Sequence, residues 1–454
     1  MSKLKFTLLF LGSLMIGNAS IQAAENSNTE AQVTKGEGVS TENSSSAGVT
    51  EPQQPVTRED FEGVRNEIAV LKDAYDRTLA NNIANSQRSL KISGTLSSSY
   101  SMPTSSNASP DPIPTFSGGS ATLSFKGNLK KDYAEGRNLD YVLSLATTTS
   151  GTVTNYVQPT DAYLQYSIFP SLDNEKPLFY VQFGQQKKPF GLEATTNDDK
   201  KPTINSATFV SKLNVSKRDI GILLRGDISP TLDLGFNYRI PLIEYSIGIF
   251  NGSGPNALDT NKQKDIGGRI IINAPVDYNS SYRGLSLGGS FYRGKDDISK
   301  TIGTSTIKDI GSRNLYGVDL AYVATPIGFT AEYASQESEY LSGTTKANIL
   351  KPTRKSDGYT LTVFYNFGDQ FLKNARVESR QDDYWPTTYQ PFVRFDHYDP
   401  DKAVSGDDTS IVTYGFNVFF AETTKLQFNY NVRHERSNSD LHQNDFVAQF
   451  QYGF

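Results

Sequence analysis

The sequence predicts an all-β protein, a sixteen-stranded antiparallel transmembrane β-barrel that follows an N-terminal coiled-coil helix. From residue 89 to the C-terminus, apolar and polar residues alternate with a period of two in sixteen successive segments. Hydrophobic residues make up only 37% of the 454 residues, which is a small share for a chain of this length. A barrel explains both observations, because half of each strand faces a water-filled lumen while lipid covers the other half.

Composition excludes several other classes of protein. A mean hydropathy of −0.46 excludes a bundle of membrane-spanning helices, since each such helix needs about 20 consecutive apolar residues. The chain has no cysteine, which excludes disulfides, thiolate nucleophiles and Cys-ligated zinc. The net charge of −5 is modest and does not favour nucleic acid as a partner.

The first element, residues 1–24, is predicted to be a signal peptide. Lys3 and Lys5 precede an apolar stretch at 6–16, and Ile21-Gln22-Ala23 forms a small-residue cleavage site. The apolar stretch is too short for a membrane anchor. Residues 25–56 are rich in Ser, Thr, Glu, Asn and Gln, so they are expected to form a disordered linker.

The next element, residues 57–88, is predicted to be a helix in the periplasm. Its apolar residues recur at spacings of three and four, which places them on one seam of a helix: Phe61, Val64, Ile68, Leu71 and Tyr75. Such a short helix cannot bury this seam alone. It either packs against its own chain or forms a parallel coiled coil between identical subunits. We favour the coiled coil, because nothing globular precedes the helix.

Residues 89–454 contain the barrel strands. At the C-terminus, apolar Phe446, Phe450 and Phe454 alternate with polar Gln449 and Gln451, and the other segments repeat this pattern. The predicted strands are 89–100, 119–130, 137–149, 158–169, 177–188, 218–227, 243–250, 264–274, 283–293, 313–324, 327–337, 357–368, 389–398, 411–421, 424–434 and 444–454. Residues 226–241 leave two interpretations open, an additional strand or an extended turn. The connection at 368–388 is long for a turn.

A soluble β-sandwich also alternates, but three features favour a membrane barrel. Aromatic residues concentrate at the segment ends on the apolar face, as in the girdles of outer-membrane barrels. The other face carries charged and amide side chains, which a sandwich core would bury without partners. Longer and shorter connections tend to alternate, which places both termini at the end with the short turns.

The longest connection, residues 189–217, is predicted to fold into the lumen and narrow it. Between Gln185 and Arg218 stand seven basic residues against three acidic ones, in a chain that is acidic overall. The candidate anion-binding residues are Lys187, Lys188, Lys200, Lys201 and Lys212, together with lumen-facing Arg225, Arg269 and Arg394. A ring of such residues in a constriction attracts anions. The alternative is that they are solvated charges or lumen-side ion pairs, and pairs are expected between Asp265 and Arg269 and between Asp396 and Arg394.

Residues 184–193, GQQKKPFGLE, resemble the GQ-x-K-x-PF-x-x-E segment of the phosphate-selective porin family. Arg218-Asp219-Ile220-Gly221, the GIFNGSG segment at 248–254 and Gly268-Arg269 follow in that family's order. The resemblance is dense between 178 and 272, and Lys187 matches the Lys of the motif. It implies a trimeric, sixteen-stranded porin of the outer membrane, with the loop after the fifth strand in the pore.

The expected function is therefore an outer-membrane porin for passive diffusion of small hydrophilic solutes, with a preference for phosphate-like anions. A non-selective porin is one alternative. A sugar-selective porin is another, because lumen-facing aromatic residues could form a track for sugars: Tyr163, Tyr180, Tyr292, Phe364, Phe392 and Phe419. A surface adhesin is suggested only by the Ser-rich residues 97–120.

No catalytic site is expected. His397, His434 and His442 are the only histidines, and none has a Ser or Asp at a diagnostic spacing, so an enzyme is not predicted. No cofactor or metal is expected, since the acidic pairs Asp382-Asp383 and Asp407-Asp408 lack a calcium-binding spacing. The expected partners are small solutes, outer-membrane lipid and two further copies of the chain.

Overall fold

A computed structural model describes Ile68, Lys72 and residues 90–454 without 107–112, 119, 133–136, 151–152, 170–176, 234–237, 260, 278, 325, 369–387, 422 and 437–440. The predicted signal peptide 1–24 and linker 25–56 lie outside these residues. Of the predicted helix 57–88, the description covers Ile68 and Lys72, which are both helical and exposed. Within the described part of the chain, no helix has the length and apolar character needed to cross a membrane.

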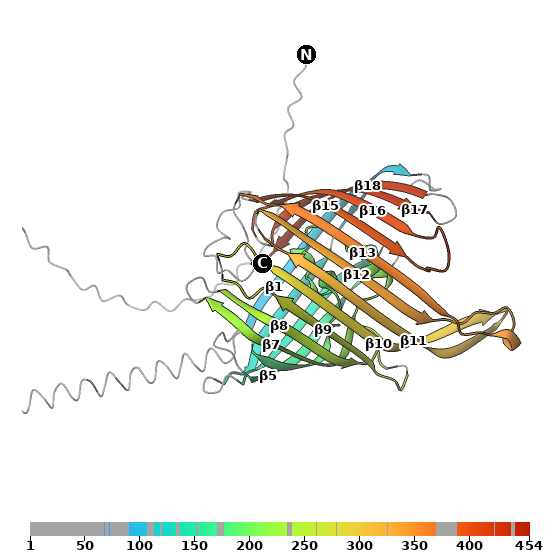
Figure 1. Ribbon diagram of the computed structural model, residues 1–454, viewed down its shortest axis with the longest axis horizontal. Coiled ribbons are helices and arrows are strands. Elements are labelled where there is room, and N and C mark those ends of the chain that lie inside the picture. Colours follow the sequence, from blue (N-terminus) through green and yellow to red (C-terminus); the bar gives the residue numbers. More distant parts are fainter. Residues whose placement is uncertain are drawn as a thin grey trace, which may run out of the picture. The chain divides into compact units, whose positions relative to one another are not determined.

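The strands form one closed antiparallel sheet, with the chain passing from strand to neighbouring strand around a barrel (Figure 1). They are β1 (Leu90–Ser106), β2 (Thr115–Ser117), β3 (Ala121–Lys130), β4 (Leu139–Ser150), β5 (Val153–Phe169), β6 (Phe179–Lys187), β7 (Arg218–Asp233), β8 (Tyr238–Phe250), β9 (Asp265–Asn273), β10 (Leu285–Ile302), β11 (Ser305–Tyr322), β12 (Ile327–Glu339), β13 (Thr353–Tyr365), β14 (Phe367–Gly368), β15 (Thr388–Asp399), β16 (Thr409–Phe419), β17 (Lys425–Glu435) and β18 (Leu441–Gly453). The short helices are α2 (Leu192–Thr195), η1 (Asp198–Lys200), α3 (Thr208–Lys212) and η2 (Lys346–Asn348).

These segments make sixteen strands around the barrel. β2 and β3 both pair with β1, one beyond the other, and β13 and β14 both pair with β15 in the same way. Each of these two pairs of segments therefore forms one interrupted strand. The pairing of β1 with β18 closes the sheet, as the sequence predicts.

Both ends of the described barrel lie at the same rim. The amide of Gly94, near the start of β1, donates to the carbonyl of Phe454 at 2.9 Å, and the amide of Phe454 donates back to Gly94 at 3.0 Å. The tight turn between β16 and β17 lies at this rim too, because Lys425 pairs with Gln451 near the C-terminus. We name this rim the turn end and the opposite rim the loop end.

The barrel is apolar outside and polar inside. On β9, Ile266, Ile270 and Ile272 are about half exposed, whereas Asp265 and Arg269 on the opposite face are buried. The same alternation holds in other strands, as a period of two requires. A surface of exposed isoleucine, valine, leucine and aromatic side chains is unstable in water but is the surface that lipid covers.

Several strands extend beyond their predicted limits. The first strand was predicted to end at residue 100, but β1 continues to Ser106, because Leu96, Tyr100 and Met102 keep the period of two on one face. β7 runs to Asp233 and pairs through Leu232 with β8, so residues 226–241 belong to one long hairpin and add no strand. β10 and β11 were predicted at 283–293 and 313–324, but β10 continues to Ile302 and β11 starts at Ser305. Their long hairpin projects at the loop end, opposite the C-terminus (Figure 1). The 368–388 connection lies almost wholly outside the described residues.

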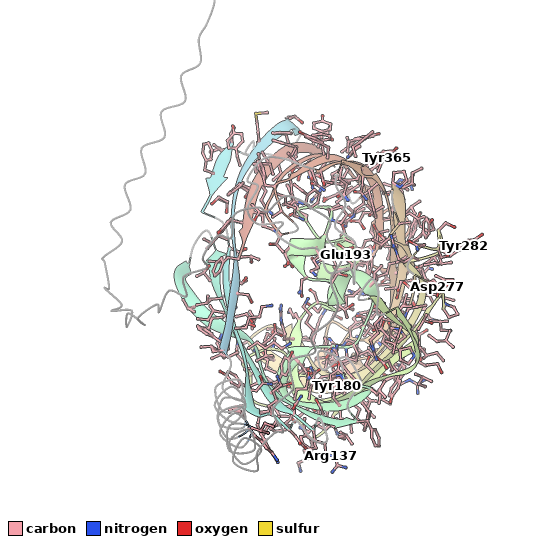
Figure 2. The ribbon with its side chains drawn as sticks, turned by 90° about the vertical axis from the view of Figure 1, so that its left-hand side faces the viewer. Arg137, Tyr180, Glu193, Asp277, Tyr282 and Tyr365 are labelled. Atoms are coloured by element: carbon pink, nitrogen blue, oxygen red, sulfur yellow. The ribbon has the colours of Figure 1, made fainter. Side chains whose placement is uncertain are left out.

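Residues 189–217, which connect β6 to β7, lie inside the barrel and are named here the constriction loop. Figure 2 shows this segment, with Glu193 labelled, within the ring of strands. It carries α2, η1 and α3. The prediction that the longest connection folds into the lumen is confirmed.

Candidate functional site

The constriction loop is held by a hydrophobic core that lies inside the barrel. Seven of its apolar side chains are buried: Phe190, Ala194, Ala207, Phe209, Val210, Leu213 and Val215. They pack in one cluster with wall residues Leu223, Phe250, Tyr292, Leu315, Ala334 and Tyr398. Burying a large apolar side chain stabilises a fold by about 1.5–3 kcal/mol, so this cluster fixes the loop as firmly as an ordinary core fixes a helix.

Two aromatic residues of the loop sit where the wall has no side chain. A Cβ atom added to Gly317 of β11 would lie 3.0 Å from the tip of the Phe190 ring. A Cβ atom added to Gly358 of β13 would lie 2.5 Å from Cβ of Phe209. Real Cβ atoms do not approach that closely, so glycine is required at Gly358 for the loop to reach this depth.

A carboxylate and a guanidinium join the loop to β15. Glu193 accepts a hydrogen bond from the amide of Ala207, 2.8 Å away, and lies 3.4 Å from Arg394 Nη1. Arg394 also donates to Asn205 O at 2.8 Å and lies 3.6 Å from Asp396. Asp396 in turn accepts from the amide of Thr208 at 2.8 Å, at the start of α3. The expected pairing of Asp396 with Arg394 is therefore confirmed.

A buried glutamate holds the turn that begins α2. Glu332 of β12 accepts a hydrogen bond from the amide of Glu193 at 2.8 Å. Gly191 precedes this amide with a φ of 70°, which L side chains rarely adopt. A Cβ atom there would also lie 2.1 Å from Glu332 Oε1, so only glycine lets the carboxylate approach the turn.

Backbone carbonyls of the loop's middle are bound by the far wall. Lys425 Nζ of β17 donates to Lys201 O at 2.6 Å, and the Lys425 side chain is fully buried. Asn417 Nδ2 and Gln427 Nε2 donate to Pro202 O at 2.8 and 3.0 Å. The loop therefore extends from β6 across to β16 and β17.

The two motif lysines fasten the base of the loop. Lys187 Nζ donates to the carbonyls of Thr195 and Thr196, at 3.3 and 3.1 Å, and so caps the end of α2. Lys188 is buried, donates to Asn214 O at 3.1 Å and lies 4.8 Å from the centroid of the Tyr292 ring. Both lysines are therefore engaged with the protein.

The remaining motif residues also hold the loop end of the barrel. Arg218 makes two hydrogen bonds to Asp161 of β5, at 3.2 and 3.1 Å. Asp219 accepts from the amide of Gly252 at 2.9 Å, which joins the Arg218-Asp219 segment to the GIFNGSG segment. These short motif segments therefore meet in space around the stem of the constriction loop.

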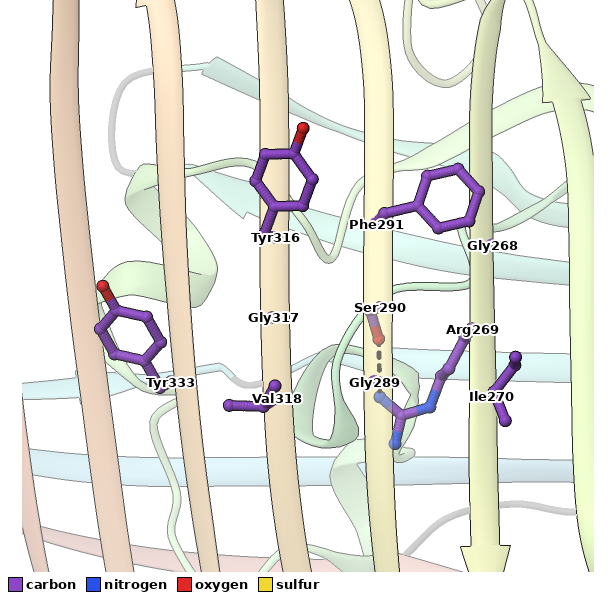
Figure 3. A pocket seen from close by; sticks show the side chains of 10 residues that line it. All are labelled: Gly268, Arg269, Ile270, Gly289, Ser290, Phe291, Tyr316, Gly317, Val318 and Tyr333. Carbon is purple, nitrogen blue, oxygen red and sulfur yellow. Dashed lines mark hydrogen bonds between the residues drawn. The ribbon is translucent and has the colours of Figure 1, made fainter.

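Of the other predicted anion-binding residues, Arg269 and Lys201 are also buried and paired. The prediction that Arg269 pairs with Asp265 was wrong. Arg269 makes a double hydrogen bond with Asp319, at 2.7 and 2.8 Å, because Asp319 lies on β11, two strands away on the same face. Figure 3 shows Arg269 beside Ser290, the strand residue between them. Lys201 Nζ lies 2.7 Å from Asp198.

The last three predicted residues are open to water to different degrees. Lys200 in η1 and Lys212 at the end of α3 are exposed, whereas Arg225 of β7 is half-buried. Lys212 lines a cavity of about 720 Å³ at the loop-end side of the constriction loop, together with Arg394, Arg433 and Glu435. The remaining side chains of this cavity are largely hydroxyls, amides and carboxylates.

The charge of Asp198 in the loop is stabilised by its partner. Crowding by the loop acts to raise the pKa of this carboxyl, but the charge of Lys201 and the hydrogen bond that it donates lower the pKa further. Asp198 is therefore ionised over the neutral and mildly acidic range. The carboxylate of Asp198 compensates the charge of Lys201, so Lys201 is a poor binding site for a solute anion.

The lumen-facing aromatic residues do not form a sugar track in the part of the wall that the loop covers. Tyr292, Phe364 and Phe392 are buried. The Tyr292 hydroxyl donates to Asp265 at 2.7 Å, and Phe392 packs over Gly415 of β16. These rings are packing residues.

A second hollow, of about 520 Å³, opens on the outer wall of β9 to β12 (Figure 3). Gly289 leaves part of its floor open, the Phe291 ring lies against Gly268, and Tyr316 and Tyr333 complete its sides. Most of its lining residues are apolar or glycine. In the described residues, no group of three or more His, Asp and Glu side chains is arranged to hold a metal ion.

The docking residues are the part of the site that sequence reasoning missed. Phe190, Phe209, Gly317, Gly358 and Lys425 were not singled out as functional. Two signals were present: apolar residues inside a connection that should be polar, and glycines at lumen-facing positions within strands. Neither signal reveals which residue meets which.

Comparison with known proteins identifies relatives. The family described as phosphate-selective porin O and P matches residues 119–454. The trimer form of OmpT, an outer membrane protein of Vibrio cholerae, is 13% identical, with a TM-score of 0.51 over 81% of this chain and 99% of that one. An anion-selective porin from Comamonas acidovorans is 12% identical, with a TM-score of 0.50 over 81% of this chain and 100% of that one. At these identities the likeness concerns the fold. No curated protein matches the sequence.

Proposed function

The chain belongs to the phosphate-selective porin O and P family, and from this premise we propose that it is an anion-preferring channel for phosphate-like solutes. As a member of that family it is an outer-membrane porin, a water-filled barrel through which small hydrophilic solutes diffuse passively. The observation that carries the proposal is the constriction loop, which crosses the lumen and is anchored to strands between β10 and β18. Every solute must pass beside it.

Charge in the open part of the lumen supports anion preference. Four of the eight predicted residues, Lys188, Lys201, Arg269 and Arg394, are buried. Lys201, Arg269 and Arg394 are also paired with carboxylates, so these buried cations make no direct contact with a solute and add little net charge to the lumen. The cations that can contact a passing anion directly are exposed Lys200 and Lys212 and half-buried Arg225. A cation that faces a narrow, partly desolvated passage raises the local anion concentration.

We further propose the assembly and topology of the chain. The barrel forms a homotrimer in the outer membrane, in keeping with the trimer form of the Vibrio cholerae relative. Residues 1–24 direct export, residues 25–56 are a linker, and helix 57–88 forms a coiled coil in the periplasm. The start of β1 at the turn end supports the periplasmic location in this proposal.

The test is the reversal potential of purified trimer in a planar bilayer under a salt gradient, with phosphate and maltodextrin added as blockers. We expect the sign of the potential to show anion preference, and phosphate to reduce the chloride current. A cation-selective potential contradicts anion preference and leaves the porin intact. Block by maltodextrin without block by phosphate supports the sugar-selective alternative.

A further inference from the structure

The lumen wall has a covered side and an open side. Beneath the constriction loop, the lumen-facing side chains are buried, as for Arg394, Asn417, Lys425, Gln427 and Asn429. The loop's hydrogen bonds to the wall go to β10, β12, β15, β16, β17 and β18. A solute that passes the loop therefore faces another part of the wall.

That part is formed by β1, β3 and β4. On β1, Leu90, Ile92 and Leu96 are exposed on the lipid face, so the residues between them face the lumen. The register places the same face of β3 and β4 beside them. None of the lumen-facing residues Lys91, Ser93, Thr95, Ser124 and Lys126 is buried, in contrast to the wall beneath the loop.

The open wall is lined with hydroxyl groups. Thr95 Oγ1 lies 2.6 Å from Thr122 Oγ1, and Ser124 Oγ lies 2.9 Å from Ser144 Oγ on β4. Nearer the loop end, Ser97 Oγ lies 3.1 Å from Ser120 Oγ. A hydroxyl both donates and accepts, and it rotates to suit its partner. Each of these pairs can therefore donate one hydrogen bond to a passing solute.

Two lysines stand at the turn end of this row. Lys91 of β1 is the direct ladder partner of Lys126 of β3, and both are exposed. Directly opposite residues on antiparallel strands have Cβ atoms about 4.5–5.5 Å apart, and like charges in that position repel. No ion pair is described for either lysine among the residues that the structure covers. An anion that bridges the two ammonium groups relieves the repulsion.

We propose that the wall of β1, β3 and β4 is a binding path for tetrahedral oxyanions such as phosphate, with Lys91 and Lys126 as its binding site at the turn end. The proposal deepens the anion-preferring function proposed above and rests on it. Phosphate suits the arrangement, because its several oxygens accept hydrogen bonds from ammonium and hydroxyl groups at once. Chloride makes no such directed set of bonds.

Acidic residues limit the charge of this site. Asp140 of β4 lies diagonally across from Lys126, through the pair of Asn128 with Asp140, and accepts a hydrogen bond from Asn128. Lys130, Lys131 and Asp132 follow on the same rim, so four lysines lie near two carboxylates. A channel site must bind weakly enough to release its ion, and the carboxylate of Asp140 serves that requirement.

The test compares phosphate block of the chloride current in wild-type trimer and in the double variant Lys91→Gln, Lys126→Gln. Both side chains are exposed, so the barrel is expected to fold, and heat-resistant migration of the trimer checks this. We expect the half-blocking phosphate concentration to rise about tenfold, which corresponds to about 1.4 kcal/mol. The matched control is Lys300→Gln, Lys308→Gln, two cross-hairpin lysines of β10 and β11, which should leave the block unchanged.

The outcomes separate this proposal from the proposed function. An unchanged half-blocking concentration in an anion-selective wild-type channel overturns the binding path and leaves the anion-preferring porin standing. A wild-type channel that prefers cations overturns the proposed function itself. Loss of phosphate block with anion preference retained supports both, since Lys200, Lys212 and Arg225 still act on the field.

Discussion

Cβ of Phe209 lies so close to Gly358 that a Cβ atom on the glycine would be only 2.5 Å away. Phe209 is fully buried at the start of α3, and Gly358 is a lumen-facing residue of β13. A strand that is otherwise rich in side chains is therefore notched at one position, and the loop enters the notch. The depth of the constriction depends on this contact.

The first prediction concerns that notch. Gly358→Leu should displace α3 into the lumen and change the single-channel conductance, because the new side chain occupies the place of Phe209. Phe209→Ala should loosen the same contact at a cost of about 3–5 kcal/mol, and should increase current noise as the loop moves. Single-channel recording in planar bilayers measures both.

The control is Gly289→Leu in β10, where an added Cβ meets no atom within 4 Å. It should leave the conductance unchanged. If Gly358→Leu and Phe209→Ala both conduct as quietly as the wild type, the notch does not set the position of the loop.

The second prediction concerns Arg394. Arg394→Gln should lower the stability of the barrel by about 3–5 kcal/mol, because it leaves buried Asp396 and its neighbour Glu193 without their cation. Urea unfolding of the trimer in detergent, followed by far-ultraviolet circular dichroism, measures this change in the free energy of unfolding. Arg433→Gln removes a more exposed pair with Glu435 and should cost at most about 1 kcal/mol. Equal losses in the two variants would argue against Arg394 as an anchor.

The sequence predicted the barrel well because period-two alternation directly records which face of a strand meets lipid. All sixteen predicted segments correspond to strands, and even the error at the Ser-rich end of β1 arose from neglect of Leu96, Tyr100 and Met102, which carry the same alternation.

The site was less predictable. Arg269 was correctly placed on the lumen face, but its partner Asp319 lies 50 residues away on a strand that is not its neighbour. Alternation gives the face of a residue and not its neighbours across the sheet. Lys187 and Lys188 are the clearest example: their charge indicated a pore, but they bind the loop's own carbonyls. The contacts that decide this depend on the path of the loop inside the barrel.

The third prediction concerns pH and the pair of Asp198 with Lys201. The pKa of Asp198 is lowered in the folded protein, so the pair contributes stability above the pKa of the unfolded chain, near 3.9. That contribution is lost as the pH falls through the lower, folded value. Asp198→Asn should therefore lower the urea midpoint at pH 7 and pH 5 alike, and have no effect near pH 2. Because Asp198 is exposed, the difference should stay below about 1 kcal/mol. A difference that grows on acidification would contradict the direction of the shift.

The fourth prediction concerns Lys212, the exposed cation at the end of α3. Lys212→Glu should reduce anion preference, seen as a smaller reversal potential in a salt gradient. The substitution replaces a positive charge with a negative charge beside a partly desolvated passage, so the side chain repels anions that Lys212 attracts. The conductance should change little, since Lys212 is not an anchor of the loop. Lys308→Glu, on the projecting β10–β11 hairpin, makes the same charge change far from the constriction and should have no effect. Lys187→Glu should differ from both, because it breaks the cap of α2 and so alters conductance together with selectivity.

The fifth prediction concerns the N-terminal segment. Deletion of residues 25–84, with the signal peptide kept, should leave an inserted barrel, because β1 starts at Leu90 and closes the sheet by pairing with β18. The trimer should lose heat resistance in gel electrophoresis, since the predicted seam of Phe61, Val64, Ile68, Leu71 and Tyr75 would no longer join the subunits. Ile68→Asp provides a matched point variant: Ile68 is helical and exposed within one chain, as expected of a seam that another chain covers. A trimer with unchanged heat resistance in both variants would instead favour a helix that packs on its own chain.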